Sequence, residues 1–148
     1  MIHAHSRTHR RLALALGLTC LLFAGGVAHA LSVPGMAGVP ANAADNSCFN
    51  ATIGGAVQNA ACGPRVWKIP LAVNEGTHTV AVAAGNGNTG CQLITVNQTG
   101  SVVAASTPQS FTTTQVLFFT ATQPNSGSTY FTCNVGTNAS IYSVNYSQ

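Results

Sequence analysis

Glu75 and His78 are the first candidates for catalysis, because an acid and a possible base lie close together in the short stretch NEGTHTVAV at 74–82. A hydrolytic relay needs a nucleophile, a base and an orienting acid within hydrogen-bond reach of one another. His78 could be the base, but the sequence has only one other carboxylate, Asp45. We expect Glu75 and His78 to lie at an exposed turn, outside the kind of cleft that catalysis uses. The sequence therefore predicts that the protein is not an enzyme.

The scarcity of acids weighs against other chemistries too. Glycoside hydrolysis needs two carboxylates around one bond, and calcium sites draw on several carboxylates, although a site built from backbone carbonyls stays open. The stretch GNGNTG at 85–90 has the glycine spacing of a dinucleotide-binding loop, but a strand-like segment follows it where that motif needs a helix. We predict no metal and no cofactor.

Residues 1–30 are typical of a secretory signal peptide. Three arginines within residues 7–11 precede the apolar run LALALGLTCLLFAGG, and an A-x-A site follows at 28–30. Signal peptidase recognises this order, and the run is too short for a persuasive membrane span. We predict cleavage after Ala30, with a second A-x-A site at 41–43 as the alternative. The style of the leader is bacterial, so the destination is the periplasm, the cell surface or the extracellular space.

Removing this leader makes the chain nearly neutral. The full sequence has a formal net charge of +3, but three of its five Lys and Arg residues lie in the leader. Arg65 and Lys68 then stand against Asp45 and Glu75. Because no basic patch remains to displace counterions, we expect neither nucleic acid nor an anionic membrane as a partner.

Four cysteines remain outside the leader: Cys48, Cys62, Cys91 and Cys133. An even number in an exported chain indicates two disulfides, for which three connectivities are possible. We favour Cys48–Cys62 and Cys91–Cys133. Zinc is the alternative, but there is no C-x-x-C pair and the spacings match no usual set of zinc ligands.

Short β-type segments make up most of the chain. Residues 31–45 are rich in Ala, Gly and Pro and are expected to be a flexible linker. Residues 46–148 are expected to form one antiparallel β-sandwich, jelly-roll-like or a meander. Candidate strands lie at 51–57, 66–73, 77–84, 91–98, 101–106, 110–114, 115–122, 129–135 and 139–146, with hairpin loops at 74–76, 85–90, 96–101 and 123–128.

Alternation of residue types predicts which side chains share a face of a strand. In the run at 77–84, Val80, Val82 and Ala84 share one face. In the last strand, Tyr142, Val144 and Tyr146 are expected on one face, opposite Ile141, Ser143 and Asn145.

Aromatic residues are the remaining candidates for binding, because a surface aromatic ring can stack on a sugar. Trp67 alternates with Ile69, Leu71 and Val73 and is expected in the core, although it stays a candidate ligand-binding residue. Tyr130 falls on a polar face and is the better surface candidate. Phe118 and Phe119 should point to opposite faces. One of the pair is core, and the other is buried between layers, covers an edge or forms an exposed apolar patch.

The order GTHTVAV, a strand with Cys91, then YFTCNV and ASIYSVNY resembles small exported bacterial jelly-roll domains. This resemblance implies the fold and the Cys91–Cys133 pairing, and no functional residue. We expect a non-catalytic binding module, possibly for carbohydrate, since a neutral surface rich in Thr, Asn, Ser and Gln suits polyhydroxylated ligands. The alternative is a structural, matrix or adhesin-type protein that acts by self-association.

Overall fold

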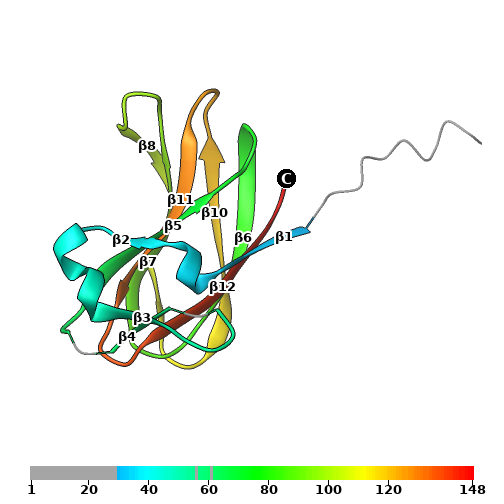
Figure 1. Cartoon of the computed structure of the whole chain (residues 1–148). Coiled ribbons are helices and arrows are strands. Elements are labelled where there is room, and N and C mark those ends of the chain that lie inside the picture. Colours follow the sequence, from blue (N-terminus) through cyan, green and yellow to red (C-terminus); the bar gives the residue numbers. More distant parts are fainter. Residues whose placement is uncertain (1–29, 56, 61) are drawn as a thin grey trace, which may run out of the picture.

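The computed structural model describes residues 30–55, 57–60 and 62–148, so nearly all of the predicted leader lies outside it. The described chain forms two antiparallel β-sheets that pack face to face, together with two short 3-10 helices (Figure 1). These helices are η2 (Gly35–Ala37) and η3 (Ala43–Cys48). The predicted all-β sandwich is confirmed.

One sheet, called here the β6 sheet, has its strands in the order β10-β6-β12-β4-β3, and β1 also pairs with β12. The other, the β11 sheet, has the order β2-β5-β11-β7-β8, and β9 also pairs with β7. The strands are β1 (Ala30–Pro34), β2 (Val39–Pro40), β3 (Phe49–Ala51), β4 (Val57–Asn59), β5 (Arg65–Leu71), β6 (Gly76–Ala84), β7 (Asn88–Val96), β8 (Val102–Ala105), β9 (Gln109–Phe111), β10 (Gln115–Gln123), β11 (Ser128–Val135) and β12 (Ser140–Ser147).

Three of the four predicted hairpin loops instead carry the chain from one sheet to the other. The loops at 74–76, 85–90 and 123–128 join strands of different sheets, and only the loop at 96–101 closes a hairpin, between β7 and β8. Alternation reports which face of a strand is buried, but a strand with one buried face can belong to either sheet. The repeated crossing gives the jelly-roll-like arrangement rather than the meander.

The segment at 31–45, predicted to be a flexible linker, is held against both sheets. Within it, β1 pairs with β12 through five residue pairs, and β2 pairs with β5. The half-buried side chains of Leu31 and Val33 pack on the core. The composition of this segment did not reveal its two strands, because alanine, glycine and proline occur in edge strands and where backbones approach closely as well as in loops.

Two further predictions from the pattern are wrong in detail. The chain turns between β3 and β4 where a strand was predicted at 51–57, and Gly54 and Gly55 have the positive φ values that this turn uses. In β12 the register shifts between Ile141 and Ser143, a β-bulge. The bulge puts Tyr142 outside, and Ile141 joins Val144 and Tyr146 in the core.

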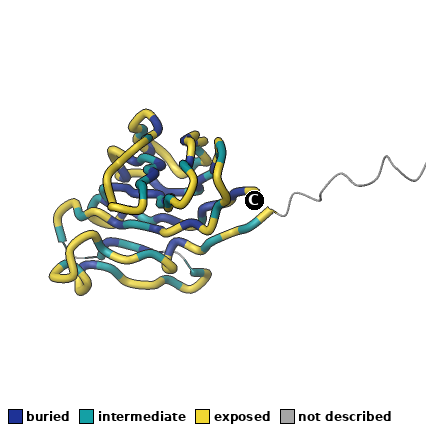
Figure 2. The backbone as a smooth tube through the Cα atoms, turned by 90° about the horizontal axis from the view of Figure 1, so that it is seen from above, coloured by how far each residue is buried: buried dark blue, intermediate teal, exposed yellow. Residues whose placement is uncertain are grey.

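The core lies between the sheets and follows the alternation of the strands (Figure 2). Val80, Val82 and Ala84 are fully buried, as predicted. Phe119 of the β6 sheet packs edge-on against Phe131 of the β11 sheet, with 5.3 Å between the ring centroids. This contact joins the two layers.

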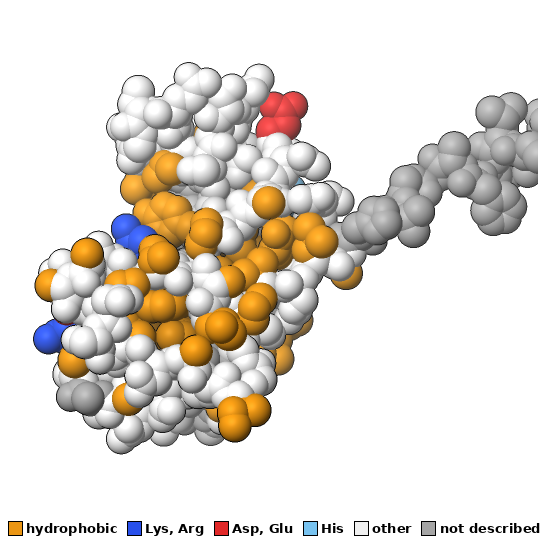
Figure 3. Space-filling view, viewed as in Figure 1, with side chains coloured by type: hydrophobic (Ala, Val, Ile, Leu, Met, Phe, Trp, Pro, Cys, Tyr) orange, Lys and Arg blue, Asp and Glu red, His pale blue; other side chains and the backbone are white. Residues whose placement is uncertain are grey.

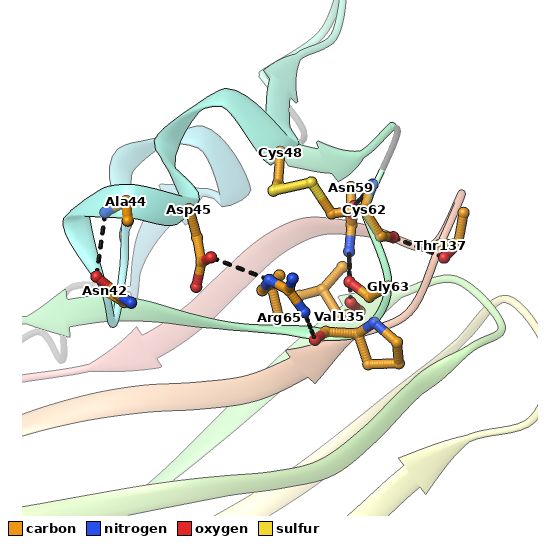
Figure 4. A network of polar contacts seen from close by, with 11 residues as sticks. Asn42, Ala44, Asp45, Cys48, Asn59, Cys62, Gly63, Arg65, Val135 and Thr137 are labelled. Atoms are coloured by element: carbon orange, nitrogen blue, oxygen red, sulfur yellow. Dashed lines mark hydrogen bonds and ion pairs between the residues drawn. A yellow bond between two sulfur atoms is a disulfide. The ribbon is translucent and has the colours of Figure 1, made fainter.

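Both predicted disulfides are present, Cys48–Cys62 and Cys91–Cys133. The second connects the neighbouring strands β7 and β11 on the core side. The first closes a loop organised by Asn59, which is fully buried (Figure 4). The Asn59 amide donates to the carbonyls of Val135 and Gly63, at 2.9 and 3.1 Å, and its oxygen accepts from the backbone N–H of Cys62.

Candidate ligand-binding surfaces

The structure does not assemble Glu75 and His78 into a catalytic pair. Glu75 is exposed in the connection between β5 and β6. The His78 imidazole, in β6, is 2.7 Å from the backbone carbonyl of Asn74. The other carboxylate, Asp45, accepts a hydrogen bond from Arg65 Nε at 3.0 Å (Figure 4). Among the described residues, no hydrogen bond or ion pair therefore joins Glu75 to His78 or either of them to Asp45.

Trp67 is a core residue, as its alternation predicted, so it is wrong as a ligand-binding candidate. The side chain is 5% exposed, and its ring lies 4.5 Å from that of Phe49. The indole Nε1–H donates to the carbonyl of Gly35 at 2.9 Å. A ligand at the surface would not reach this ring.

Tyr130 lies on the outer side of the β11 sheet and is half-buried. Its cross-strand neighbours are Pro70 in β5 and Ile94 in β7. The ammonium of Lys68 lies over the ring, 5.2 Å from its centroid. We call this surface the Tyr130 face, formed by Lys68, Pro70, Gln92, Ile94, Tyr130, Thr132 and Asn134.

The outer side of the β6 sheet presents the more exposed ring. Phe118 is 64% exposed and Val116 51% exposed, both on the outer side of β10. Their partners in β6 are Ala81 and Ala83, whose small side chains leave the two larger ones standing above the sheet. Phe119, the next residue, points into the core. Of the three options for the second phenylalanine, the structure realises the exposed apolar patch.

Four threonines continue this surface beyond Phe118. Thr79 and Thr120 are cross-strand partners with 2.8 Å between their hydroxyl oxygens. Thr77 and Thr122 form the next pair along the strands, at 2.9 Å. Each hydroxyl can make further hydrogen bonds beyond the one to its partner. The result is a ladder of solvent-exposed hydroxyls directly beside an aromatic ring.

Tyr142 borders the same surface from β12. It is 41% exposed, and its hydroxyl lies 3.4 Å from the position that a Cβ on Gly85 would take. The β-bulge turns this side chain outward, which alternation alone did not predict. We call the whole surface the Phe118 face, formed by Thr77, Thr79, Ala81, Ala83, Val116, Phe118, Thr120, Thr122 and Tyr142.

The Phe118 face has no charged side chain. The charged side chains of the described chain are those of Asp45, Arg65, Lys68 and Glu75, and all four lie elsewhere. On the side of the molecule seen in Figure 3, hydrophobic side chains form a broad band over the region of β1, β2 and β12, with basic and acidic side chains at the margins. Low charge is therefore general to the surface, while the threonine ladder is particular to one face.

A shallow hollow of about 460 Å³ lies between β2 and η3. Its lining is mostly apolar: Val39, Pro40, Ala41, Ala43 and Asn46. In the described part of the chain, no three His, Cys, Asp or Glu side chains gather as a metal site would need. Over the same residues, no helix is long and apolar enough to span a membrane.

No protein-family model and no curated protein matches the sequence. Among solved structures, the chain is similar to the C-terminal CBM6, a carbohydrate-binding module, of LamC, a marine laminarinase from Zobellia galactanivorans. The TM-score is 0.47 at 9% identity, over 81% of this chain and 100% of the other.

Two further similar structures are whole enzymes. A GH26-CBM35 β-(1,4)-mannanase from Podospora anserina aligns with a TM-score of 0.45 at 11% identity, over 82% of this chain and 28% of that one. An exo-β-1,3-galactanase from Phanerochaete chrysosporium, with galactose, aligns with a TM-score of 0.41 at 20% identity, over 82% of this chain and 30% of that one. The chain thus spans under a third of each. At these values no residue and no activity is carried over.

Proposed function

We propose that the protein is an exported, non-catalytic binding module that holds a neutral polysaccharide on the Phe118 face. The observation that carries the proposal is the ring of Phe118 beside the paired hydroxyls of Thr79 and Thr120. A sugar ring has apolar C–H groups that pack on an aromatic face and hydroxyls that exchange hydrogen bonds. The Phe118 face offers both kinds of contact side by side.

The exposure of Phe118 supports a role in binding. A contiguous apolar patch on a soluble protein commonly marks an interaction site, whereas single exposed residues need no explanation. Here Val116 and Tyr142 accompany the phenylalanine, and no charge interrupts the group. A neutral sugar gives up far less hydration free energy than an ion on such a surface, and hydrogen bonds to the threonine hydroxyls can replace what its own hydroxyls lose.

Export is the second part of the proposal. Its support is the predicted leader together with the two disulfides, which persist in oxidising compartments. Polysaccharides of cell walls and matrices lie in those compartments. The bacterial source rests on the style of the leader alone.

Self-association through the same face is the second candidate function. The observation that favours it is the position of Val116 and Phe118 on β10, a nine-residue strand at the edge of its sheet. However, two backbone carbonyls of this strand already accept side-chain donors from the other sheet. Gln109 Nε2 donates to Phe118 at 2.8 Å, and Thr95 Oγ1 donates to Thr122 at 3.0 Å. These bonds protect the edge against pairing with a second copy.

Depletion of the oxidised protein by insoluble neutral glucans, xylans and mannans tests the proposal. Phe118→Thr removes the ring and keeps a β-forming residue, and should weaken retention about tenfold, the upper range for an aromatic contact. Val102→Thr is the matched control, because Val102 is 60% exposed on β8, a strand of the other sheet. It should leave retention unchanged.

Light scattering on the same samples separates the two candidate functions. A concentration-independent monomer that is retained on one neutral polymer supports the binding module. A mass that grows with concentration and falls back in Phe118→Thr, without retention on any polymer, would contradict it and favour self-association.

A further inference from the structure

Lys68 is the one cation of the described chain without a carboxylate partner. Arg65 is paired with Asp45 at 3.0 Å, and no ion pair joins Lys68 to Glu75 in the described chain. The contact that the structure gives for the Lys68 ammonium is the ring of Tyr130. The Tyr130 face therefore has a single positive charge that no protein acid neutralises.

The position of Lys68 is fixed by the register of the β11 sheet. Lys68 in β5 is directly opposite Thr132, and Tyr130 is opposite Pro70, so the lysine and the tyrosine are diagonal neighbours on one face. On the far side of β11, Gln92 is opposite Thr132. An ammonium, an aromatic ring and an amide thus lie within two rows of the sheet, around the buried side chain of Thr132.

The ammonium over the Tyr130 ring discriminates between ligands. A cation over an aromatic face is attracted to it, and a neutral sugar would have to displace that contact without replacing the charge interaction. A sugar with a carboxylate can take the ammonium as its own ion-pair partner. The ring face that Lys68 leaves is then open for stacking.

We propose that the Tyr130 face is a second carbohydrate site, selective for a sugar that carries a carboxylate. Lys68 binds the carboxylate and Tyr130 stacks on the sugar ring. Gln92 Nε2 donates to the Ser106 carbonyl at 3.0 Å, so the Gln92 amide oxygen accepts from a sugar hydroxyl at the border. The carbohydrate class of this ligand rests on the proposed function. The selectivity for an acid rests on the unpaired Lys68 itself, because charge complementarity singles out an anionic occupant.

Two matched polymers test this selectivity directly: polygalacturonate, and polygalacturonate fully methyl-esterified, which keeps the sugar ring and removes the charge. Binding to polygalacturonate should exceed binding to the ester. Lys68→Gln should weaken polygalacturonate binding about fivefold, the upper range for an exposed ion pair. It should leave or improve binding of the ester, because it frees the ring of Tyr130.

Three variants complete the design. Lys68→Arg keeps the charge and should retain the preference for the acid. Tyr130→Ala should weaken binding of the acid about tenfold by removing the stacking surface. Phe118 lies on the other sheet, so Phe118→Thr should not change binding of the acid. Raising NaCl from about 0.02 to about 0.5 M should weaken polygalacturonate binding, because salt screens an exposed charge pair.

Several outcomes would overturn the second site. Equal binding of the acid and its ester, or equal losses for both in Lys68→Gln, would remove the selectivity. Dextran sulfate binding as well as polygalacturonate, with no effect of Tyr130→Ala, would reduce the site to a non-specific charge. The proposed function is judged separately, by neutral polymers and Phe118→Thr, so either idea can fail while the other stands.

Discussion

Phe118 and Phe119 are consecutive residues of β10 with opposite environments. Phe119 is 1% exposed and packs against Phe131 of the other sheet, whereas Phe118 is 64% exposed on the outer surface. A strand with one buried face puts neighbouring side chains on opposite sides. One residue therefore stabilises the sandwich, and the other is free for a ligand.

This division predicts very different effects on stability. Phe119→Ala should lower the free energy of unfolding by about 3–5 kcal/mol, the usual loss for a large buried aromatic. Phe118→Thr should change it by no more than about 0.5 kcal/mol, as for most surface substitutions. Urea unfolding followed by tryptophan fluorescence measures both. A large loss in Phe118→Thr would show that this ring has a structural role.

The N-terminal segment predicts where the leader can be removed. A chain beginning at Leu31 keeps β2 and nearly all of β1, whereas a chain beginning at Ala44 lacks both. The shorter chain also loses the carbonyl of Gly35, leaving the buried Trp67 Nε1–H without its acceptor. We expect the shorter chain to be destabilised by at least about 3 kcal/mol, from lost burial and an unsatisfied donor.

The mass of the exported protein checks the same point in the cell. Cleavage after Ala30 should give the mature product, and cleavage in the 41–43 site should give little folded protein. Equal thermal stability of the chains beginning at Leu31 and Ala44 would contradict the structural role of β1 and β2.

Asn59 should be the most sensitive polar residue of the Cys48–Cys62 loop. Asn59→Ala leaves the buried carbonyl of Val135 and the N–H of Cys62 without these hydrogen bonds, and should cost about 2–3 kcal/mol. Asn50→Ala, at an exposed position of β3, is the control and should be neutral. Thermal unfolding measures the stability of both variants. An equal loss of stability in the two would show that Asn59 has no special role.

Glu75 and His78 should be dispensable for binding. Neither belongs to the Phe118 face or the Tyr130 face. Glu75→Gln and His78→Gln should therefore leave retention on neutral polymers and on polygalacturonate unchanged within about twofold, which is under 0.5 kcal/mol. Depletion assays at one pH measure this. Loss of retention in either variant would place the ligand at the β5–β6 connection instead.

Alternation explains how much of the fold could be predicted from the sequence. It identified the strand around Val80 and Val82 and the opposite directions of Phe118 and Phe119, because a single buried face leaves a two-residue period. It could not tell which sheet each strand joins, since that depends on partners far away in the chain. The β-bulge at Tyr142 breaks the period, so Ile141 and Tyr142 were each predicted on the wrong face of the last strand, while Val144 and Tyr146 share a face as predicted.

The candidate surfaces were harder to predict for the same reason. The runs T-H-T at 77–79 and T-A-T at 120–122 show that threonines share a face within each strand, but only the pairing of β6 with β10 brings the two runs together. Likewise Lys68 and Tyr130 are far apart in sequence and meet across β5 and β11. A single sequence holds no signal for such contacts between strands.

Chemical-shift mapping with a bound neutral oligosaccharide tests the central claim most directly. Amide spectra of the oxidised protein would be recorded with the fragment of whichever neutral polymer retains it. We expect saturable shifts concentrated at 77–83 and 116–122, which disappear in Phe118→Thr and persist in Val102→Thr. Shifts concentrated elsewhere, or unchanged by loss of the Phe118 ring, would contradict the assignment of the neutral-sugar site to this face.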